Sequence, residues 1–554
     1  MLTGKKEADN GSDTNAGAID DGRSSTIGNR LSPTFQLQLV GEGLLVGIVG
    51  GGVVTLYRWS LTQAEQALRF ITGAAAGHAI MIAGWFALLA LICFVVCKLM
   101  LWEPYTQGSG IPQTDAEVIG QLDMPWYRVL PVKFVEGTLC AFAGLSLGRE
   151  GPSVQLGAVS GKAVSRGLKR GRGEERLLMT CGAAAGMSAA FGAPLTGVLF
   201  ALEEIHKEFT ASLILSVMTS SVAADYFVSQ VLGLEPVLRL TFIRDLPHGH
   251  YLLLILLGIF CGVMGGLHNK GMFFAQEKLY GRIKHYVPYA RLAIPFAIAG
   301  VAAFCFPSLM CGGEAILELI EDHHVQPFFL VCALLIGKYL FTTASFASGA
   351  PGGTLFPLVV MGMLVGEAFG LAATHVTSLP SEFVGNFVVM GIAGLFSAVV
   401  QAPVTGVVLA FELTGSLDAL LSVSIVSIVS YATVKCLDID AFYEYLLGNL
   451  LSVPRQKVAT NGFSGEKVLH VHTVGTGSKI EGKKIKDIAW PVSMRVVTLT
   501  RAGVEIIPTG DTTIEALDEL LCIMSTGYEM ASQQWLWHMC RGSVMSDSLP
   551  HTYQ

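Results

Sequence analysis

A charged glycine turn, Gly148-Arg149-Glu150-Gly151-Pro152, interrupts a long apolar part of the chain. Residues 134–147 before it are mostly apolar, and residues 154–164 after it carry a single charge. A carboxylate at membrane depth costs about 2.5–3.5 kcal/mol on insertion scales, so it is usually functional and faces a cavity that the protein lines. Glu150 is therefore the first candidate functional residue.

Two further glycine turns have the same character, GSGIP at residues 108–112 and GAPGGTLFP at residues 349–357. A glycine turn that opens a helix leaves backbone N–H groups unpaired, and the helix dipole adds roughly half a positive charge there. Three such turns that converge could hold an anion without a full cation, so the ion could also leave. The pattern predicts an anion site built from broken helices, with the Ser109 hydroxyl as a further donor.

Glu150 could couple this site to protons. When ionised, its carboxylate could occupy the anion position itself. When protonated, it is neutral and could swing away, and burial favours this neutral form. The competing structural interpretation is a simple ion pair between Glu150 and Arg149.

The composition predicts an all-α polytopic membrane protein. The 554 residues are 52% hydrophobic and 14% charged, with a mean hydropathy of +0.55, whereas soluble domains carry about 25% charged residues. Several apolar runs are shorter than the ~20 residues of a straight span, which predicts tilted and broken helices. The clear runs are 79–101, 251–267, 292–306, 328–341 and 420–434.

Basic residues give the expected orientation. They cluster between Lys162 and Arg176 and again between Lys270 and Arg291, and the positive-inside rule makes both loops cytoplasmic. Residues 1–34 are polar and predict a disordered extension without a cleavable signal peptide. We expect a multi-pass cell-membrane protein with both termini in the cytoplasm.

The membrane part contains an internal repeat. Gly182–Glu203 aligns without gaps with Gly391–Glu412, and both segments contain Ala-Pro-x-Thr-Gly-Val. Such symmetry, with Gly and Pro interrupting the hydrophobic segments, indicates a repeat-built transporter. Glu203 corresponds to Glu412, so we expect it to be structural and to bind backbone N–H groups.

The chain changes character after residue 451. Residues 452–465 predict a linker, residues 466–525 a small α/β unit, and the tail 526–554 has no assigned role. Within the small unit a short helix is expected over 479–488. The expected strands are 468–474, 494–500 and 504–507.

The three glycine turns resemble the selectivity-filter segments of the CLC family of chloride channels and chloride/proton exchangers, over about Phe35–Val453. The resemblance implies a CLC-type inverted repeat and a homodimer with one pore per subunit. It also implies that Tyr443 completes the inner chloride site, with Tyr445 as the second choice, and that Ser109 favours chloride over nitrate. The implied chloride-binding residues are Ser109, Arg149, Gly151, Thr354, Leu355 and Tyr443.

The same resemblance implies a second functional acid. Exchangers of the family carry an inner, proton-accepting Glu that many of its channels lack, and Glu204 falls on that position. We expect chloride/proton exchange with Glu150 as gate and external proton acceptor and Glu204 as internal acceptor. A passive chloride channel is the alternative, in which Glu204 would be an ordinary helix-end carboxylate.

The small unit resembles the C-terminal subdomain of RCK (TrkA-type) modules through its segments 477–485, 496–503 and 507–512. Leu517-Asp518 stands where the family's Gly-Asp is expected. The resemblance implies dimerisation and a small cytosolic ligand of the nucleotide type. Eukaryotic CLC proteins usually carry paired CBS domains instead, so the RCK-like tail also implies a bacterial plasma membrane.

Other functions are not expected. Gly144–Gly148 matches the GxSxG pattern of hydrolases, but it lies in an apolar run, so an intramembrane enzyme that uses Ser146 is disfavoured. The sequence predicts no metal site, no cofactor and no nucleic-acid partner.

Overall fold

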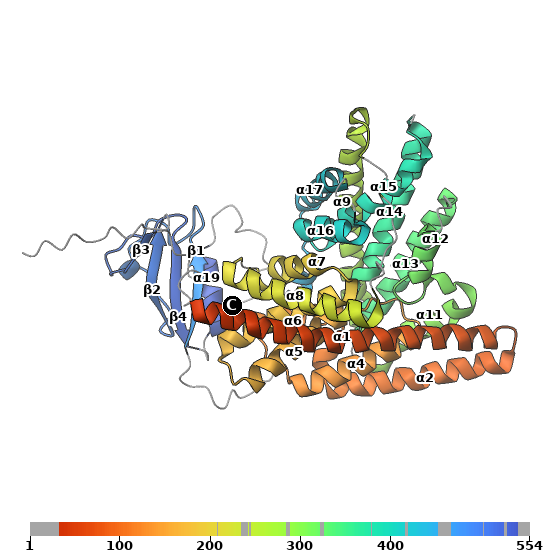
Figure 1. Cartoon of the computed structure of the whole chain (residues 1–554), viewed down its shortest axis with the longest axis horizontal. Coiled ribbons are helices and arrows are strands. Elements are labelled where there is room, and N and C mark those ends of the chain that lie inside the picture. The colour runs from red at the N-terminus through yellow and green to blue at the C-terminus, as the bar shows by residue number, and fades with distance from the viewer. Residues whose placement is uncertain are drawn as a thin grey trace, which may run out of the picture. The chain divides into compact units, whose positions relative to one another are not determined.

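The computed structural model describes residues 33–207, 209–233, 242, 245–283, 288–321, 326–377, 379–415, 419–452, 467–501, 504–525 and 529–540. The predicted extension 1–34 and linker 452–465 lie almost wholly outside the described residues. The chain forms two units, a helical unit over Leu31–Thr460 and a second unit that contains Asn461–Gln554 (Figure 1).

The helical unit is built from helices of very unequal length, as the interrupted apolar runs predicted. Its described α-helices are α1 (Pro33–Ala75), α2 (Ala79–Trp102), α3 (Ile111–Val118), α4 (Trp126–Phe142), α5 (Glu150–Gly167), α6 (Arg172–Phe191), α7 (Pro194–Phe200), α8 (Ala211–Leu232), α9 (Leu252–Phe274), α10 (Gly281–Ile283), α11 (Pro288–Cys305), α12 (Glu314–Glu321), α13 (Phe328–Ala347), α14 (Leu355–Val376), α15 (Val384–Val399), α16 (Pro403–Thr414), α17 (Leu420–Cys436) and α18 (Phe442–Ser452). A π-helical turn, η3 (Ala201–His206), continues α7.

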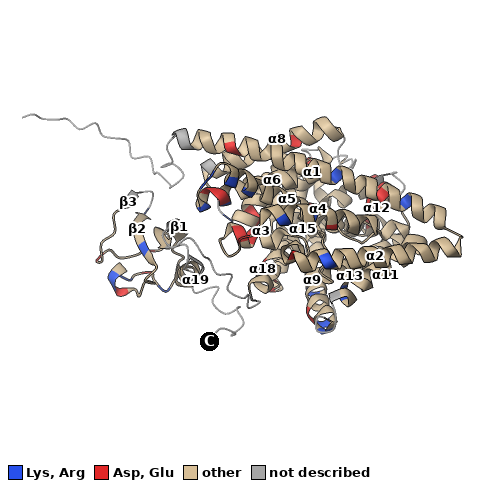
Figure 2. Cartoon of the chain, turned by 90° about the horizontal axis from the view of Figure 1, so that it is seen from below, with Lys and Arg blue, Asp and Glu red and all other residues tan. Residues whose placement is uncertain are grey.

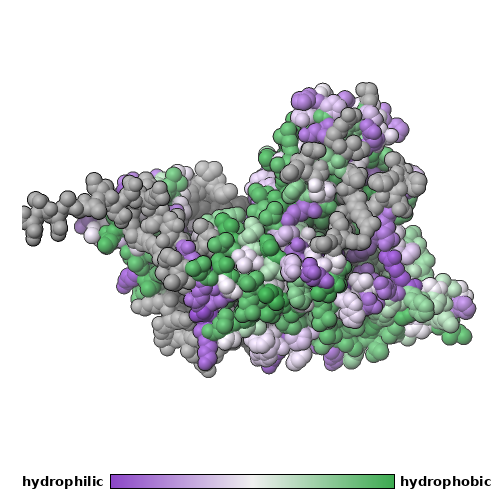
Figure 3. All heavy atoms as spheres, viewed as in Figure 1, coloured by the Kyte–Doolittle hydropathy of each residue, from purple (hydrophilic) through white to green (hydrophobic). Residues whose placement is uncertain are grey.

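The helical unit presents an apolar surface, as a bilayer requires. Within the described residues, six helical segments are long and apolar enough to cross a membrane. Charged residues are sparse along α2 (Figure 2), and apolar residues cover much of the face over α1 and α2 (Figure 3). Exposed apolar side chains include Ile80, Met81, Leu91 and Phe94 of α2 and Leu252, Leu256 and Ile259 of α9. The protein is a multi-pass membrane protein.

Both halves of the repeat pack their helices through glycine. In the first half, a Cβ on Gly157 of α5 would collide with the backbone of α6 at Gly182. In the second half, a Cβ on Gly362 of α14 would collide with the backbone of α15 at Gly391. Small residues allow this close approach of helices, which supplies van der Waals packing in a lipid environment.

The two repeats hold each other reciprocally, which shows that the sequence repeat is structural. The Glu203 carboxylate accepts hydrogen bonds from the backbone N–H (2.9 Å) and hydroxyl (2.7 Å) of Thr405, at the start of α16. Glu412 accepts the corresponding bonds from Thr196, at the start of α7 (2.7 and 2.6 Å). Each glutamate thus caps the helix of the other repeat, as predicted for Glu203.

The second unit contains an antiparallel sheet of strand order β1-β4-β2-β3. The strands are β1 (Lys467–Thr473), β2 (Met494–Arg501), β3 (Val504–Ile506) and β4 (Glu519–Ser525), which confirms the three predicted strands. The prediction of a helix over 479–488 was wrong, because Gly482 has a φ of 75° and only Ile485–Asp487 forms a short 3-10 turn. Helix α19 (Glu529–Cys540), in the tail without an assigned role, buries Leu536 in the core under this sheet.

In the Leu517-Asp518 pair, the aspartate keeps the family's residue type, and leucine replaces the glycine. Leu517 adopts a φ of 67°, the left-handed region where glycine is favoured, at a cost of about 1–2 kcal/mol. Asp518 is buried and binds Arg501 in a bidentate ion pair, with both N–O distances at 2.8 Å. The turn therefore forms despite the substitution.

Replacing Glu412 by Gln should destabilise the helical unit by roughly 2–3 kcal/mol, because the new amide nitrogen faces N–H donors and the charge-assisted bonds are lost. Glu203→Gln should do the same by symmetry. Thermal unfolding of the purified protein in detergent measures both. The exposed Glu318→Gln, at a surface ion pair with Arg69, is the matched control and should change stability little. Equal melting temperatures of all three variants would contradict a stabilising role for the two helix-capping glutamates.

Candidate functional site

The three glycine turns meet, and backbone hydrogen bonds join them. Gly148 and Gly353 exchange two bonds of 2.7 and 2.8 Å. Gly108 donates to Gly349 (3.1 Å), and Gly352 donates to Gly108 (3.0 Å). Helices α3, α5 and α14 begin directly after these turns, so the starts of three helices are held side by side. This confirms the predicted convergence.

Glycine is required at this junction because the turns touch. A Cβ on Gly151 would lie 2.8 Å from the Ser109 Cβ, which side chains essentially never tolerate. Ser109 is itself buried, and its hydroxyl accepts a bond from the backbone N–H of Ile111 (3.2 Å) in the first turn of α3. Close backbone approach is thus what brings the helix starts together.

Glu150 occupies the start of α14. Its carboxyl is fully buried, and Oε2 accepts a hydrogen bond from the backbone N–H of Phe356 (3.2 Å). Oε1 has no hydrogen-bond partner among the described residues and lies 3.8 Å from Nε of Arg149. The Arg149 guanidinium packs over the Phe356 ring at 5.7 Å. The Glu150 carboxylate therefore occupies the predicted anion position and also lies beside Arg149.

Two buried lysines fix the loops around the site, and sequence reasoning missed both. Lys133 of α4 is fully buried, and its ammonium donates to the carbonyls of Thr106 (2.8 Å) and Gly108 (2.6 Å). Lys338 of α13 donates to the carbonyl of Cys311 (2.8 Å). A lysine inside an apolar run was the signal available in the sequence, because such residues face a polar interior.

The structure separates the two tyrosine candidates. Tyr443, in the first turn of α18, is 1% exposed, and its hydroxyl lies within hydrogen-bonding reach of the Thr354 side chain. Its ring packs edge-on against Phe200. The Tyr445 hydroxyl instead bonds to Glu277, and its ring stacks on Phe273. Of the two candidates, only Tyr443 presents a buried hydroxyl beside Thr354, at the start of α14. Thr354 and Leu355, at the start of α14, are also buried.

Glu204 lies in η3 and is buried, with Oε1 unpartnered among the described residues. It interacts electrostatically with Lys207, Asp115 and Glu444. Nζ of Lys207 lies 3.3 Å from Glu444 and 4.0 Å from Asp115. This charge cluster, which joins α3, η3 and α18, did not emerge from the sequence because its members are far apart along the chain. Glu204 is not an ordinary helix-end carboxylate in water.

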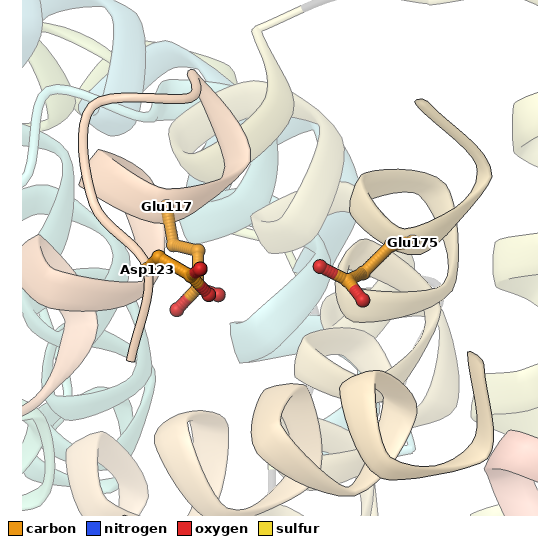
Figure 4. A group of neighbouring side chains, drawn as sticks. All are labelled: Glu117, Asp123 and Glu175. Carbon is orange, nitrogen blue, oxygen red and sulfur yellow. The ribbon is translucent and has the colours of Figure 1, made fainter. Parts of the chain in front are cut away.

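A separate group of carboxylates, Glu117, Asp123 and Glu175, lies close enough together to suggest a metal site (Figure 4). Each is bound by a cation of the protein instead. Lys162 binds both Glu117 and Asp123, Arg166 binds Glu175, and Arg172 binds Asp123 at 3.0 Å. The arrangement is a charge-balanced ion-pair network that ties α3, α5 and α6 together.

The hydrolase-like pattern has none of the expected geometry. Ser146 follows helix α4 instead of a strand, is fully buried, and shares a hydrogen bond of 2.8 Å with the hydroxyl of Thr342. A nucleophile elbow needs a strand–turn–helix setting and a base beside the serine.

Broken helices that meet at a glycine-lined junction in a repeat-built helical unit define a membrane ion transporter. Residues 88–435 match the family described as voltage gated chloride channel, and residues 469–527 match the TrkA-C domain. The chain belongs to the voltage gated chloride channel (CLC) family.

Individual relatives agree with this assignment. The H(+)/Cl(-) exchange transporter ClcA of Yersinia pestis is 32% identical over 386 residues, covering 68% of this chain and 79% of the relative. ClcA of Vibrio cholerae is 32% identical over 427 residues, covering 74% and 88%. The structure of a slow cyanobacterial Cl-/H+ antiporter superposes with a TM-score of 0.71 at 26% identity, covering 76% of this chain and 99% of that chain.

Replacing Lys133 by Met should weaken chloride binding and lower thermal stability, because the carbonyls of Thr106 and Gly108 would be buried without a donor. Each unsatisfied group costs about 1–3 kcal/mol. Calorimetric chloride titration and thermal unfolding in detergent measure the two effects. Lys98→Met, on the exposed side of α2, is the control. Unchanged binding by K133M would contradict the role of Lys133 in supporting the Ser109 turn.

Proposed function

We propose that this protein exchanges chloride for protons across the cell membrane, and that Glu150 gates the exchange by competing with the anion. The hydrogen bond from Phe356 N–H to the Glu150 carboxylate carries this proposal. It puts an anionic side chain on the helix start that the glycine turns prepare for an anion.

Protonation would release Glu150 from this position. A neutral carboxyl gains less from a helix start than a carboxylate does, so proton binding favours its departure and chloride binding in its place. Chloride would then take the Phe356 N–H that Glu150 leaves. The N–H groups of Thr354 and Leu355 and the hydroxyls of Ser109 and Tyr443 would also bind it, with Arg149 and Gly151 at the edge of the site. The buried Tyr443 hydroxyl, which lies beside the Thr354 side chain, supports this assignment.

Glu204 would accept protons on the other side. A buried carboxylate with an unpartnered oxygen is costly in its ionised form, which favours the uptake of a proton. The Lys207–Glu444 pair beside it includes a solvent-exposed carboxylate. We propose that Glu204 is the internal proton acceptor and that it makes the protein an exchanger.

The basic residues support a cytoplasmic location for the Glu204 side. Glu42 near the start of α1 pairs with Arg170 of the basic segment. His206, beside Glu204, bonds to Thr180 in the middle of α6 (3.0 Å) and interacts electrostatically with Arg176, early in the same helix. These contacts join the basic end of the helical unit, which the positive-inside rule makes cytoplasmic. The N- and C-termini would then also be cytoplasmic.

We also propose that the protein is a homodimer in the bilayer and that its TrkA-C domain binds a small cytosolic ligand of the nucleotide type. Cross-linking in native membranes tests the first point, with monomer alone as the contrary result. Titration of the full-length protein with a panel of mono- and cyclic dinucleotides tests the second, with no binding as the contrary result.

The exchange proposal is tested by proton movement driven by a chloride gradient in liposomes. Wild-type protein should pump protons uphill, Glu204→Gln should move chloride without protons, and Glu150→Gln should also lose proton coupling because it cannot titrate. The E318Q variant is the control. Chloride flux without proton movement in the wild type would instead establish the alternative, a passive channel.

A further inference from the structure

The cavity in front of Glu150 is lined by two more carboxylates. It is bounded by Glu150, Arg149 and Phe356 on the site's side, and by Glu65 of α1 and Glu314, the first residue of α12. Glu65 and Glu314 are half-buried and come from elements outside the three glycine turns. The function proposed above uses neither.

Helix α1 fixes the side to which this cavity belongs. Glu42 pairs with Arg170 at the basic end of the unit, and Glu65 is 23 residues further along the same helix. At 1.5 Å per residue, the two positions are roughly 35 Å apart along the helix, somewhat more than the ~30 Å of the hydrocarbon core. The Glu65 cavity therefore lies opposite the basic end, on the outer side.

Two acids at the mouth of an anion pathway require an explanation. Carboxylates repel an approaching anion, so a site evolved only for chloride uptake would gain from their removal. Among the described residues that line the cavity, Arg149 is the cation beside them. Acids at this position can instead exchange protons with Glu150, whose buried carboxyl lines the same cavity.

The surrounding charges leave both acids available for this exchange. Glu314 interacts electrostatically with Glu150, Glu65 and Lys338, and Glu65 also with Arg149, Arg69 and Lys338. The Lys338 ammonium is already bound to backbone carbonyls, and Arg69 lies near the exposed Glu318. One oxygen of Glu314 accepts the N–H of Gly313 (3.1 Å). Other titratable groups that line the cavity are Tyr57 of α1 and Cys140 of α4.

We propose that Glu65 and Glu314 form an outer acid pair that passes protons between Glu150 and the external solution. The proton leaves the Glu150 carboxyl for a carboxylate oxygen of the pair, and the ionised Glu150 returns to the start of α14. The pair then releases the proton to water, and the reverse sequence loads Glu150. This inference rests on the proposed exchange function.

Neutralising the pair should change the two fluxes in opposite directions. In the Glu65→Gln/Glu314→Gln double variant we expect proton flux per chloride to fall at least about tenfold, because the relay is lost. Chloride uptake at low external chloride should rise roughly threefold, because the repulsion is lost, and this gain should shrink at high ionic strength. Liposome assays that record both ions measure the ratio, and E318Q, whose carboxylate does not line the cavity, is the control.

The outcomes separate this proposal from the one on which it rests. Wild-type liposomes without proton movement would overturn both. Wild-type exchange with an unchanged proton-to-chloride ratio in the double variant would overturn only the acid pair. A proportional fall of both fluxes would indicate a structural defect, which also overturns it. Glu65→Asp, which keeps a titratable group, should restore much of the coupling in an E314Q background.

Discussion

Four backbone hydrogen bonds among Gly108, Gly148 and the Gly349–Gly353 turn hold the starts of α3, α5 and α14 together. Because the helix starts supply partial positive charge through N–H groups, the site needs no full cation to attract an anion. The glycines allow the turns to touch, and Lys133 supports the Ser109 turn from behind. A carboxylate on one of these turns, Glu150, then has a natural position on the start of a neighbouring helix.

The rest of the helical unit keeps these turns in register. Glu203 and Glu412 each cap a helix of the other repeat, so the two halves cannot separate without exposing both carboxylates and both helix starts. Glycine contacts between α5 and α6 and between α14 and α15 fix the helices that carry the turns. The same pseudo-symmetric construction thus serves both stability and the geometry of the site.

Much of this could be predicted from the sequence because the signals are local. The three turns, the repeat and the Glu203–Glu412 correspondence appear as short motifs, and the strands appear as alternating apolar residues. The parts that could not be predicted depend on contacts between distant segments. Lys133 meets Gly108 across 25 residues, and Glu65 and Glu314 line one cavity from opposite halves of the chain. Helix α19 was missed because only its packing on the sheet makes its short apolar pattern meaningful.

The central claim is that the Glu150 carboxylate and the transported anion compete for one position at the start of α14. Anomalous diffraction from crystals soaked in bromide tests it directly, in the wild type and in Glu150→Gln. The account predicts bromide within hydrogen-bonding distance of the Phe356 N–H in the Gln variant at every pH, and in the wild type only under acidic conditions. Equal bromide occupancy there in both proteins at neutral pH would contradict it.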